Sequence, residues 1–156
     1  MNASIGDSFP NKDKLDFAER NVIPGKVILC RSDIADKDKR LVIIGVSGDK
    51  KRVATLLFNT IKYFTKNARL SSLEIFFNAT GREYLDHDSY LSCIKIESIP
   101  YQRIFDRLVT NPEDLKGTMN KNDFDSACTT ATNSHTAITK DLRDFGLSGY
   151  LLQKKP

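Results

Sequence analysis

Three apolar segments rich in β-branched residues lie between Pro24 and Thr60 and are separated by polar turns. They read VILC, LVIIGV and VATLLF, and the turn before the third is Ser47-Gly48-Asp49. Short apolar runs bounded by turn residues are typical of buried strands, and runs joined by tight turns pair antiparallel. The segment therefore predicts a curled antiparallel sheet, with Arg40 opening its second strand and Thr60 closing its third.

The chain downstream of this segment predicts more strands. Apolar runs at 73–77 (LEIFF) and 91–96 (LSCIKI) read as strands, and NPED at 111–114 reads as a turn or a single helical turn. Residues 61–70 are compatible with a helix or with an irregular loop. Residues 98–109 are compatible with a strand or a short helix, because Pro100 limits any regular element at its start.

The C-terminal third predicts two helices. Asn120 or Asn122 is a suitable N-cap for a helix over about 121–134, and Thr136 is suited to cap a second helix that Gly146 ends. His135 falls between the two. The apolar face of the first helix is formed by Phe124, Ala127, Cys128 and Ala131, and that of the second by Ile138, Leu142 and Phe145.

At 156 residues the chain is most simply one domain. We expect an N-terminal arm at 1–22 with a turn or two of helix in KLDFAER, a domain at 23–150 and a basic tail at 151–156. The predicted class is α+β: an antiparallel barrel of five or six strands with flanking C-terminal helices.

Composition narrows the function classes only a little. No apolar run approaches the roughly 20 residues that span a bilayer, and the polar, acidic N-terminus does not resemble a signal peptide, so we expect a cytoplasmic protein without a membrane partner. The three cysteines form no CxxC pair, so neither a zinc site nor a disulfide framework is indicated. Cys30 and Cys93 lie in apolar runs and are predicted to be buried.

The net charge of +4 is compatible with a nucleic-acid partner, although many proteins without one are equally basic. Basic residues gather on what we predict to be two neighbouring turns. They are either ordinary solvated hairpin turns or a positive rim along an RNA backbone. The residues are Lys37, Lys39, Arg40, Lys50, Lys51 and Arg52.

The order of several motifs resembles the MazF/PemK (Kid-like) toxins over about residues 24–133. The motifs are PGKVILC, KRLVIIGVS, a strand ending in FNT, LDHDSYLSCIKI and NPEDLKGTMNKNDF. The resemblance implies an SH3-like barrel, a homodimer and a small antitoxin partner. It also implies cleavage of single-stranded RNA with no metal and no cofactor.

The resemblance carries two catalytic residues over to this chain. The family's catalytic arginine matches Arg40, and its threonine matches Thr60. The chain departs from the pattern in two places. Leu41 follows Arg40 where the family has proline, and Ser92-Cys93-Ile94 supplies no Arg or Asp where some members carry one.

Cleavage of RNA by its own 2′-hydroxyl needs a base, a cation for the phosphorane and an acid for the leaving oxygen. Arg40 suits the cationic role, and Thr60 suits a hydrogen bond to the phosphate. His87, flanked by two aspartates, is the candidate base, although a solvated loop histidine is the alternative interpretation.

Other residues are candidates for holding the RNA. Tyr63 and Phe64, next to Lys62 and Lys66, are the aromatic residues best suited to stack on bases from an exposed position, and Lys62 and Tyr63 are predicted to bind RNA. Ser89 and Ser92 are predicted to line the groove. The alternative to an enzyme is a barrel of the same family that binds RNA or a protein partner without catalysis.

Overall fold

The computed structural model describes residues 11–134 and 136–152, so residues 1–10 of the predicted arm, His135 and most of the basic tail lie outside the described residues. The strands are β1 (Lys26–Ser32), β2 (Lys37–Val46), β3 (Arg52–Asn59), β4 (Glu74–Phe77), β5 (Ser89–Pro100) and β6 (Leu115–Thr118). The α-helices are α1 (Asn11–Asn21), α2 (Ala68–Ser71), α3 (Tyr101–Thr110), α4 (Lys121–Thr132) and α5 (Thr139–Asp144).

The predicted α+β class and the antiparallel pairing are confirmed. The six strands form one sheet in the order β4-β5-β3-β2-β1-β6. The prediction of a closed barrel is not supported, because β4 and β6 are opposite edges of this sheet and are not paired with one another in the described part of the chain. Each edge strand has only four residues, which leaves little backbone for closing the sheet.

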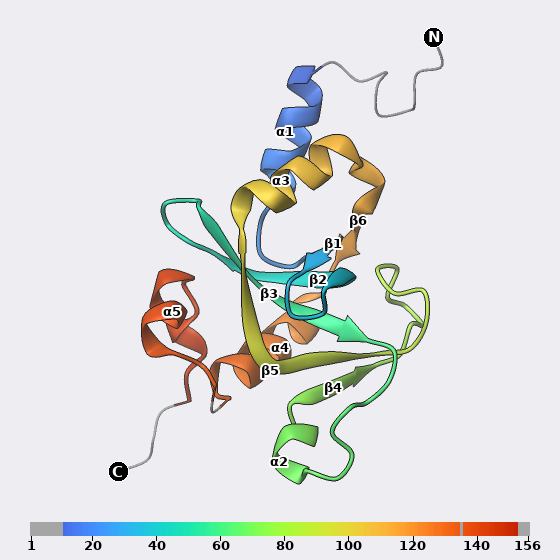
Figure 1. Ribbon diagram of the computed structural model, residues 1–156, viewed down its shortest axis with the longest axis vertical. Coiled ribbons are helices and arrows are strands. Elements are labelled where there is room, and N and C mark those ends of the chain that lie inside the picture. Colours follow the sequence, from blue (N-terminus) through green and yellow to red (C-terminus); the bar gives the residue numbers. More distant parts are fainter. Residues whose placement is uncertain (1–10, 135, 153–156) are drawn as a thin grey trace.

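The sheet is covered on both faces (Figure 1). Alternate residues of β2 and β3 point to opposite faces, so Val42 and Leu56 pack in one apolar cluster and Leu41 and Val53 in the other. The first cluster includes residues of α4 and α5, and the second includes residues of α1 and α3. This two-sided burial explains why the second and third strands read as continuous apolar runs.

The polar segment at 31–39 contains the end of β1, a tight turn and the start of β2, so the strands extend beyond their apolar runs. Ser32 pairs with Lys37, so the turn contains only the residues between them. Asp36 has a left-handed φ of 55° and pairs through its carboxylate with Arg31. Backbone pairing does not require apolar side chains, which is why the hydropathy pattern missed these strand ends.

Two segments, for each of which the sequence allowed more than one structure, are defined by the fold. β5 extends through Pro100, and α3 begins at the next residue. Residues 98–100 are therefore strand, and residues 101–109 are helix. Residues 59–72 are irregular except for α2, whose N-cap Asn67 accepts a hydrogen bond from the Leu70 amide at 3.2 Å. Residues 112–114 form the single helical turn expected of NPED.

The C-terminal helices follow the sequence more closely. Asn120 caps α4 by accepting the Asp123 amide hydrogen at 2.8 Å. The predicted cap at Thr136 is wrong, because its hydroxyl donates to the Ile94 carbonyl and α5 begins three residues later. Gly146, with φ of 73°, follows the end of α5 as predicted.

The expected burial of the cysteines is confirmed, since Cys30, Cys93 and Cys128 are all free and buried. Among the described residues, no helix has the length and apolar character required to cross a bilayer.

Gly45 allows a test of the close contact between β2 and Phe145, the residue that follows α5. A Cβ at Gly45 would lie 2.5 Å from the Phe145 carbonyl oxygen and 2.9 Å from its Cβ. We expect Gly45→Ala to lower the free energy of unfolding by about 1–3 kcal/mol, as overpacking does. The control is Gly48→Ala, where the added Cβ meets nothing within 4 Å. Equal urea midpoints for the two variants would show that this contact is absent.

Candidate functional site

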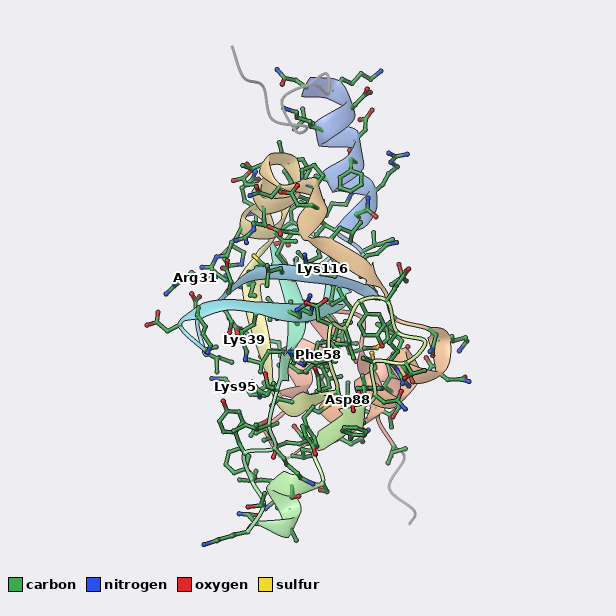
Figure 2. The ribbon with its side chains drawn as sticks, turned by 90° about the vertical axis from the view of Figure 1, so that its right-hand side faces the viewer. Arg31, Lys39, Phe58, Asp88, Lys95 and Lys116 are labelled. Carbon is green, nitrogen blue, oxygen red and sulfur yellow. The ribbon has the colours of Figure 1, made fainter. Side chains whose placement is uncertain are left out.

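A hollow of about 140 Å³ lies where the ends of β2 and β3 meet the loop between β4 and β5. It brings together residues that are far apart in the sequence, including all three predicted catalytic residues. Figure 2 labels Lys39 on β2, Phe58 on β3 and Asp88 in the loop. The hollow is lined by Leu29, Asp38, Lys39, Arg40, Phe58, Asn59, Thr60, Leu85, Asp86, His87 and Ser89.

The hollow lies just beyond the parts of β2 and β3 that are buried on both faces. Leu41 is the first residue of the buried run in β2, so Arg40 is the last residue before the core. Thr60 directly follows β3 and is exposed. Arg40 is the fourth residue of β2 and not its first, because β2 already begins at Lys37.

The Arg40 guanidinium uses only some of its hydrogen-bond donors. Its Nη2 donates to Asp86 Oδ2 at 2.6 Å, while its Nε is buried and has no hydrogen-bond partner. The Arg40 side chain is 21% exposed and that of Asp86 is 71% exposed. Because Asp86 is largely in solvent, an anion entering the hollow can replace it without leaving a buried carboxylate unpaired.

The hydrogen bonds around His87 orient its ring. Its Nδ1 lies 3.1 Å from the Asp88 carbonyl oxygen and 3.3 Å from the Ser89 hydroxyl. In the tautomer with the proton on Nδ1, this nitrogen donates to the carbonyl, which can only accept. Ser89 donates its hydroxyl to the His87 carbonyl at 2.9 Å and holds the same turn. Asp88 in turn accepts the Ala79 amide hydrogen at 2.8 Å. In the tautomer with the proton on Nδ1, Nε2 of His87 is the nitrogen that can accept a proton.

Lys39 lines the hollow beside Arg40. Burial, and then the charge of Lys37, lowers the pKa of the Lys39 ammonium. A lysine with a lowered pKa gives up its proton more readily than a solvated one. Because Lys39 and Arg40 are adjacent in β2, their side chains point to opposite faces of the sheet, and Lys39 shares the face of its cross-strand partner Cys30.

The prediction that the basic residues of the two turns form one positive rim is wrong. The turn after β2, with Lys50 and Lys51, lies at the opposite end of that strand from Lys37 and Lys39 (Figure 1). Arg52 is engaged there by Ser98, since its Nη2 donates to the Ser98 carbonyl at 2.7 Å. These three cations do not line the Arg40 hollow.

The remaining predicted residues lie near the hollow but do not line it. Lys62 and Tyr63 are in the irregular segment after Thr60, and the Tyr63 side chain is exposed. Ser92 is within β5, opposite Leu57 on one side and Glu74 on the other. Lys37 is exposed at the start of β2.

The sequence did not reveal the partner of Arg40. Asp86 was visible as a neighbour of His87, but its ion pair joins residues 46 positions apart. Such a contact depends on how the loop folds back over the sheet, for which the hydropathy pattern carries no signal.

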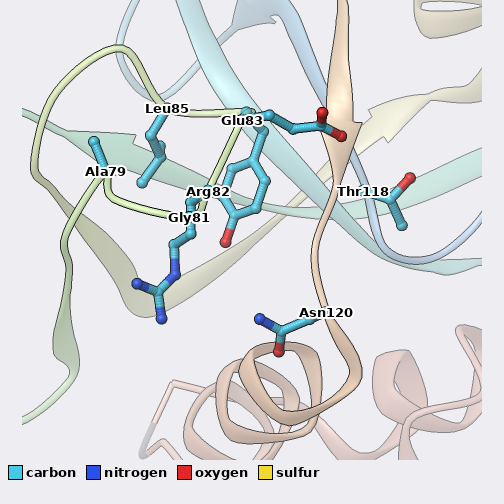
Figure 3. A pocket seen from close by; sticks show the side chains of 8 residues that line it. Ala79, Gly81, Arg82, Glu83, Leu85, Thr118 and Asn120 are labelled. Atoms are coloured by element: carbon cyan, nitrogen blue, oxygen red, sulfur yellow. The ribbon is translucent and has the colours of Figure 1, made fainter.

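A larger hollow of about 520 Å³ lies between the β4–β5 loop and the start of α4. Figure 3 shows the Arg82 guanidinium extending toward the first turn of α4, where Asn120 lies. Asp123 engages this guanidinium with two hydrogen bonds of 2.9 and 3.1 Å, and the Asn78 side chain accepts another at 2.7 Å. The cation is therefore satisfied within the protein, unlike Arg40.

No protein-family model and no curated protein sequence matches the chain. The resemblance to the MazF/PemK toxins therefore stays a prediction. Among the residues that the structure describes, no three His, Cys, Asp or Glu side chains are grouped so as to hold a metal ion.

Tyr84 beside the larger hollow gives a pH prediction. Burial, and then the charge of Asp123, raises the pKa of Tyr84 from 10.0 to about 12, and its buried hydroxyl has no hydrogen bond of ordinary geometry. The neutral phenol stabilises the fold fully below pH 10, and this contribution is lost as the pH rises through 12. Tyr84→Phe should therefore lose less stability over this range, by up to about 2 kcal/mol.

The measurement is the free energy of unfolding in urea at a series of alkaline pH values. Tyr63→Phe is the matched control, because Tyr63 is 59% exposed. Identical alkaline profiles for wild type and Tyr84→Phe would contradict the assigned cause.

Proposed function

We propose that this chain is a metal-independent endoribonuclease that cleaves single-stranded RNA at the Arg40 hollow. One observation carries the proposal. Arg40, Thr60 and His87, which lie in three separate segments of the sequence, line the same hollow, and the Arg40 Nε donor there is unpartnered. An unpaired buried donor costs free energy, and a phosphate oxygen would satisfy it.

The residues of the hollow suit attack by the 2′-hydroxyl. The phosphodiester replaces Asp86 on the Arg40 guanidinium, and Thr60 donates its hydroxyl to a second phosphate oxygen. Nε2 of His87 accepts the proton of the 2′-hydroxyl as the 2′-oxygen bonds to phosphorus. The bond from phosphorus to the 5′-oxygen breaks, and that oxygen takes a proton from solvent. The products are a 2′,3′-cyclic phosphate and a 5′-hydroxyl.

The proposal includes the finer features of the family resemblance. These are an SH3-like topology, a homodimer, a small antitoxin partner and a cytoplasmic location. They are supported by the ordered motifs between residues 24 and 133 alone, and the curled sheet with short edge strands is compatible with them.

A second candidate is an RNA-binding module without catalysis. The observation that favours it is the segment Ser92-Cys93-Ile94, which supplies no Arg or Asp. Cys93, in the segment where some family members carry a catalytic residue, is fully buried and contributes nothing to the hollow.

Cleavage of a long, weakly structured RNA in EDTA separates the two candidates. We expect wild type to give discrete fragments with 5′-hydroxyl ends, and Arg40→Ala to be slower by about 100-fold or more, as for loss of one charge-stabilising donor. Arg20→Ala is the control, because Arg20 is exposed and bonds only to a carbonyl of its own helix. Intact RNA with a retained gel shift would instead support the non-catalytic module.

The ion pair itself yields a separate prediction. Asp86→Asn removes the charge that competes with phosphate, so binding of a 2′-O-methylated RNA, which cannot be cleaved, should tighten by about 5-fold, as for a modest charge interaction. Asp36→Asn is the control, since Asp36 pairs with Arg31 at the tip of the first hairpin. Unchanged affinity, measured by fluorescence anisotropy, would show that Arg40 does not meet the phosphate.

A further inference from the structure

Two aromatic rings form a pair on the sheet, and one of them is exposed while the other is half-buried. Phe76 on β4 and Tyr90 on β5 are directly paired across the strands, and their ring centroids are 5.3 Å apart with planes tilted by 58°. Phe76 is 52% exposed, which is unusual for a phenylalanine in the middle of a strand. The fold therefore leaves a ring face open where burial would be favourable.

The segment beside this pair is basic and is held in place. Residues 60–72 carry Lys62, Lys66 and Arg69 and no acidic residue. Glu74, the neighbouring carboxylate, is buried, and it accepts the amide hydrogens of Tyr63 at 2.9 Å and Phe64 at 2.8 Å.

Glu74 also shows where this segment lies. In a strand, Glu74 and Phe76 point to the same face, so residues 63 and 64 lie over the face that carries Phe76. Tyr63 is 59% exposed and Phe64 is 38% exposed. Exposed aromatic rings and a basic segment are therefore combined on one surface, as in proteins that bind single-stranded nucleic acids.

This surface lies on the opposite face of the sheet from the Arg40 hollow. Asn59 of β3 is the direct cross-strand partner of Tyr90, and the adjacent pair, Phe58 and Leu91, belongs to the apolar cluster on the other face. Phe58 lines the hollow, and successive residues of a strand point to opposite faces. The Phe76–Tyr90 pair is therefore separate from the place proposed for the phosphate.

We propose that Phe76 and Tyr90 form a stacking subsite for an unpaired RNA base on the face of the sheet opposite the Arg40 hollow, and that the segment with Lys62, Lys66 and Arg69 follows the RNA backbone beside it. The subsite rests on the proposed function for its ligand. Such a subsite favours single strands, because a base within a duplex is already stacked and cannot present its face to a ring on the sheet.

The test measures binding of a ten-nucleotide 2′-O-methylated RNA by fluorescence anisotropy, which does not require cleavage. We expect Phe76→Ala to weaken binding about 10-fold, in line with the loss of one base–aromatic stack. Phe76→Tyr keeps the ring and should bind as wild type does, whereas Phe76→Leu keeps only the apolar bulk and should bind as Phe76→Ala does. Ile138→Ala is the control, because Ile138 is 61% exposed and lies at the start of α5.

A second probe separates base stacking from backbone binding. An abasic oligomer of the same length has the phosphates but no bases, so wild type and Phe76→Ala should bind it equally. Loss of affinity for this oligomer as well would contradict stacking. Equal binding of the base-containing RNA by wild type and Phe76→Ala would overturn the subsite, even where wild type cleaves RNA.

Two further outcomes bear on the proposal. Absence of any RNA binding by wild type overturns it, together with the proposed function. If wild type binds but does not cleave, the enzyme proposal fails, and the Phe76 variants alone decide the subsite. If Phe76→Ala dissociates a dimer in sedimentation while leaving RNA affinity unchanged, the rings contact a second copy of the chain and the subsite is wrong.

Discussion

Burial of β2 and β3 on both faces is the constraint on which the rest of the structure depends. Helices α1 and α3 cover one face, and α4 and α5 cover the other. Within the buried run of these strands a charged side chain would have no water and no partner, and its burial would cost several kcal/mol. Charged groups are therefore confined to the strand ends, and Arg40 occupies the last position before the buried run of β2.

The same constraint explains which parts of the fold could be predicted from the sequence. Two-sided burial produces the continuous runs LVIIGV and VATLLF, so both strands were visible. The N-cap at Asn120 and the spacing of Ala127, Cys128 and Ala131 likewise marked α4. Each of these signals comes from residues close together in the chain, where local preference and burial agree.

Features that depend on contacts between distant segments could not be predicted. β6 carries only LKGT, and it is a strand because β1, some 90 residues earlier, offers it an edge: Lys26 pairs with Thr118. The turn or two of helix predicted in KLDFAER is part of the longer α1, which has one buried residue in eleven, Ala18, and owes its full length to packing on α3. The sequence likewise suggested a single basic rim. It does not show that the two basic turns lie at opposite ends of one strand.

Only part of the candidate site could be predicted from the sequence, and the reason is physical. Arg40 and Thr60 flank buried strands, and flanking positions of paired strands meet at one edge of the sheet, so their proximity follows from the strand pattern. His87 and Asp86 come from a loop whose path is set by interactions such as Asp88 with the Ala79 amide and Arg82 with Asp123. Those interactions bring Asp86 to Arg40, and no periodicity in the sequence encodes them.

The Arg40–Asp86 pair has a consequence for the proposed chemistry. A phosphodiester carries one negative charge, as Asp86 does, so replacing one by the other on the guanidinium changes the electrostatic energy little. The phosphorane formed by attack of the 2′-oxygen carries a second negative charge, against which a single carboxylate competes poorly. In a hollow where Arg40 is only 21% exposed, this difference is weakly screened. The carboxylate would then weaken binding of the substrate more than binding of the transition state, which is the differential binding that accelerates a reaction.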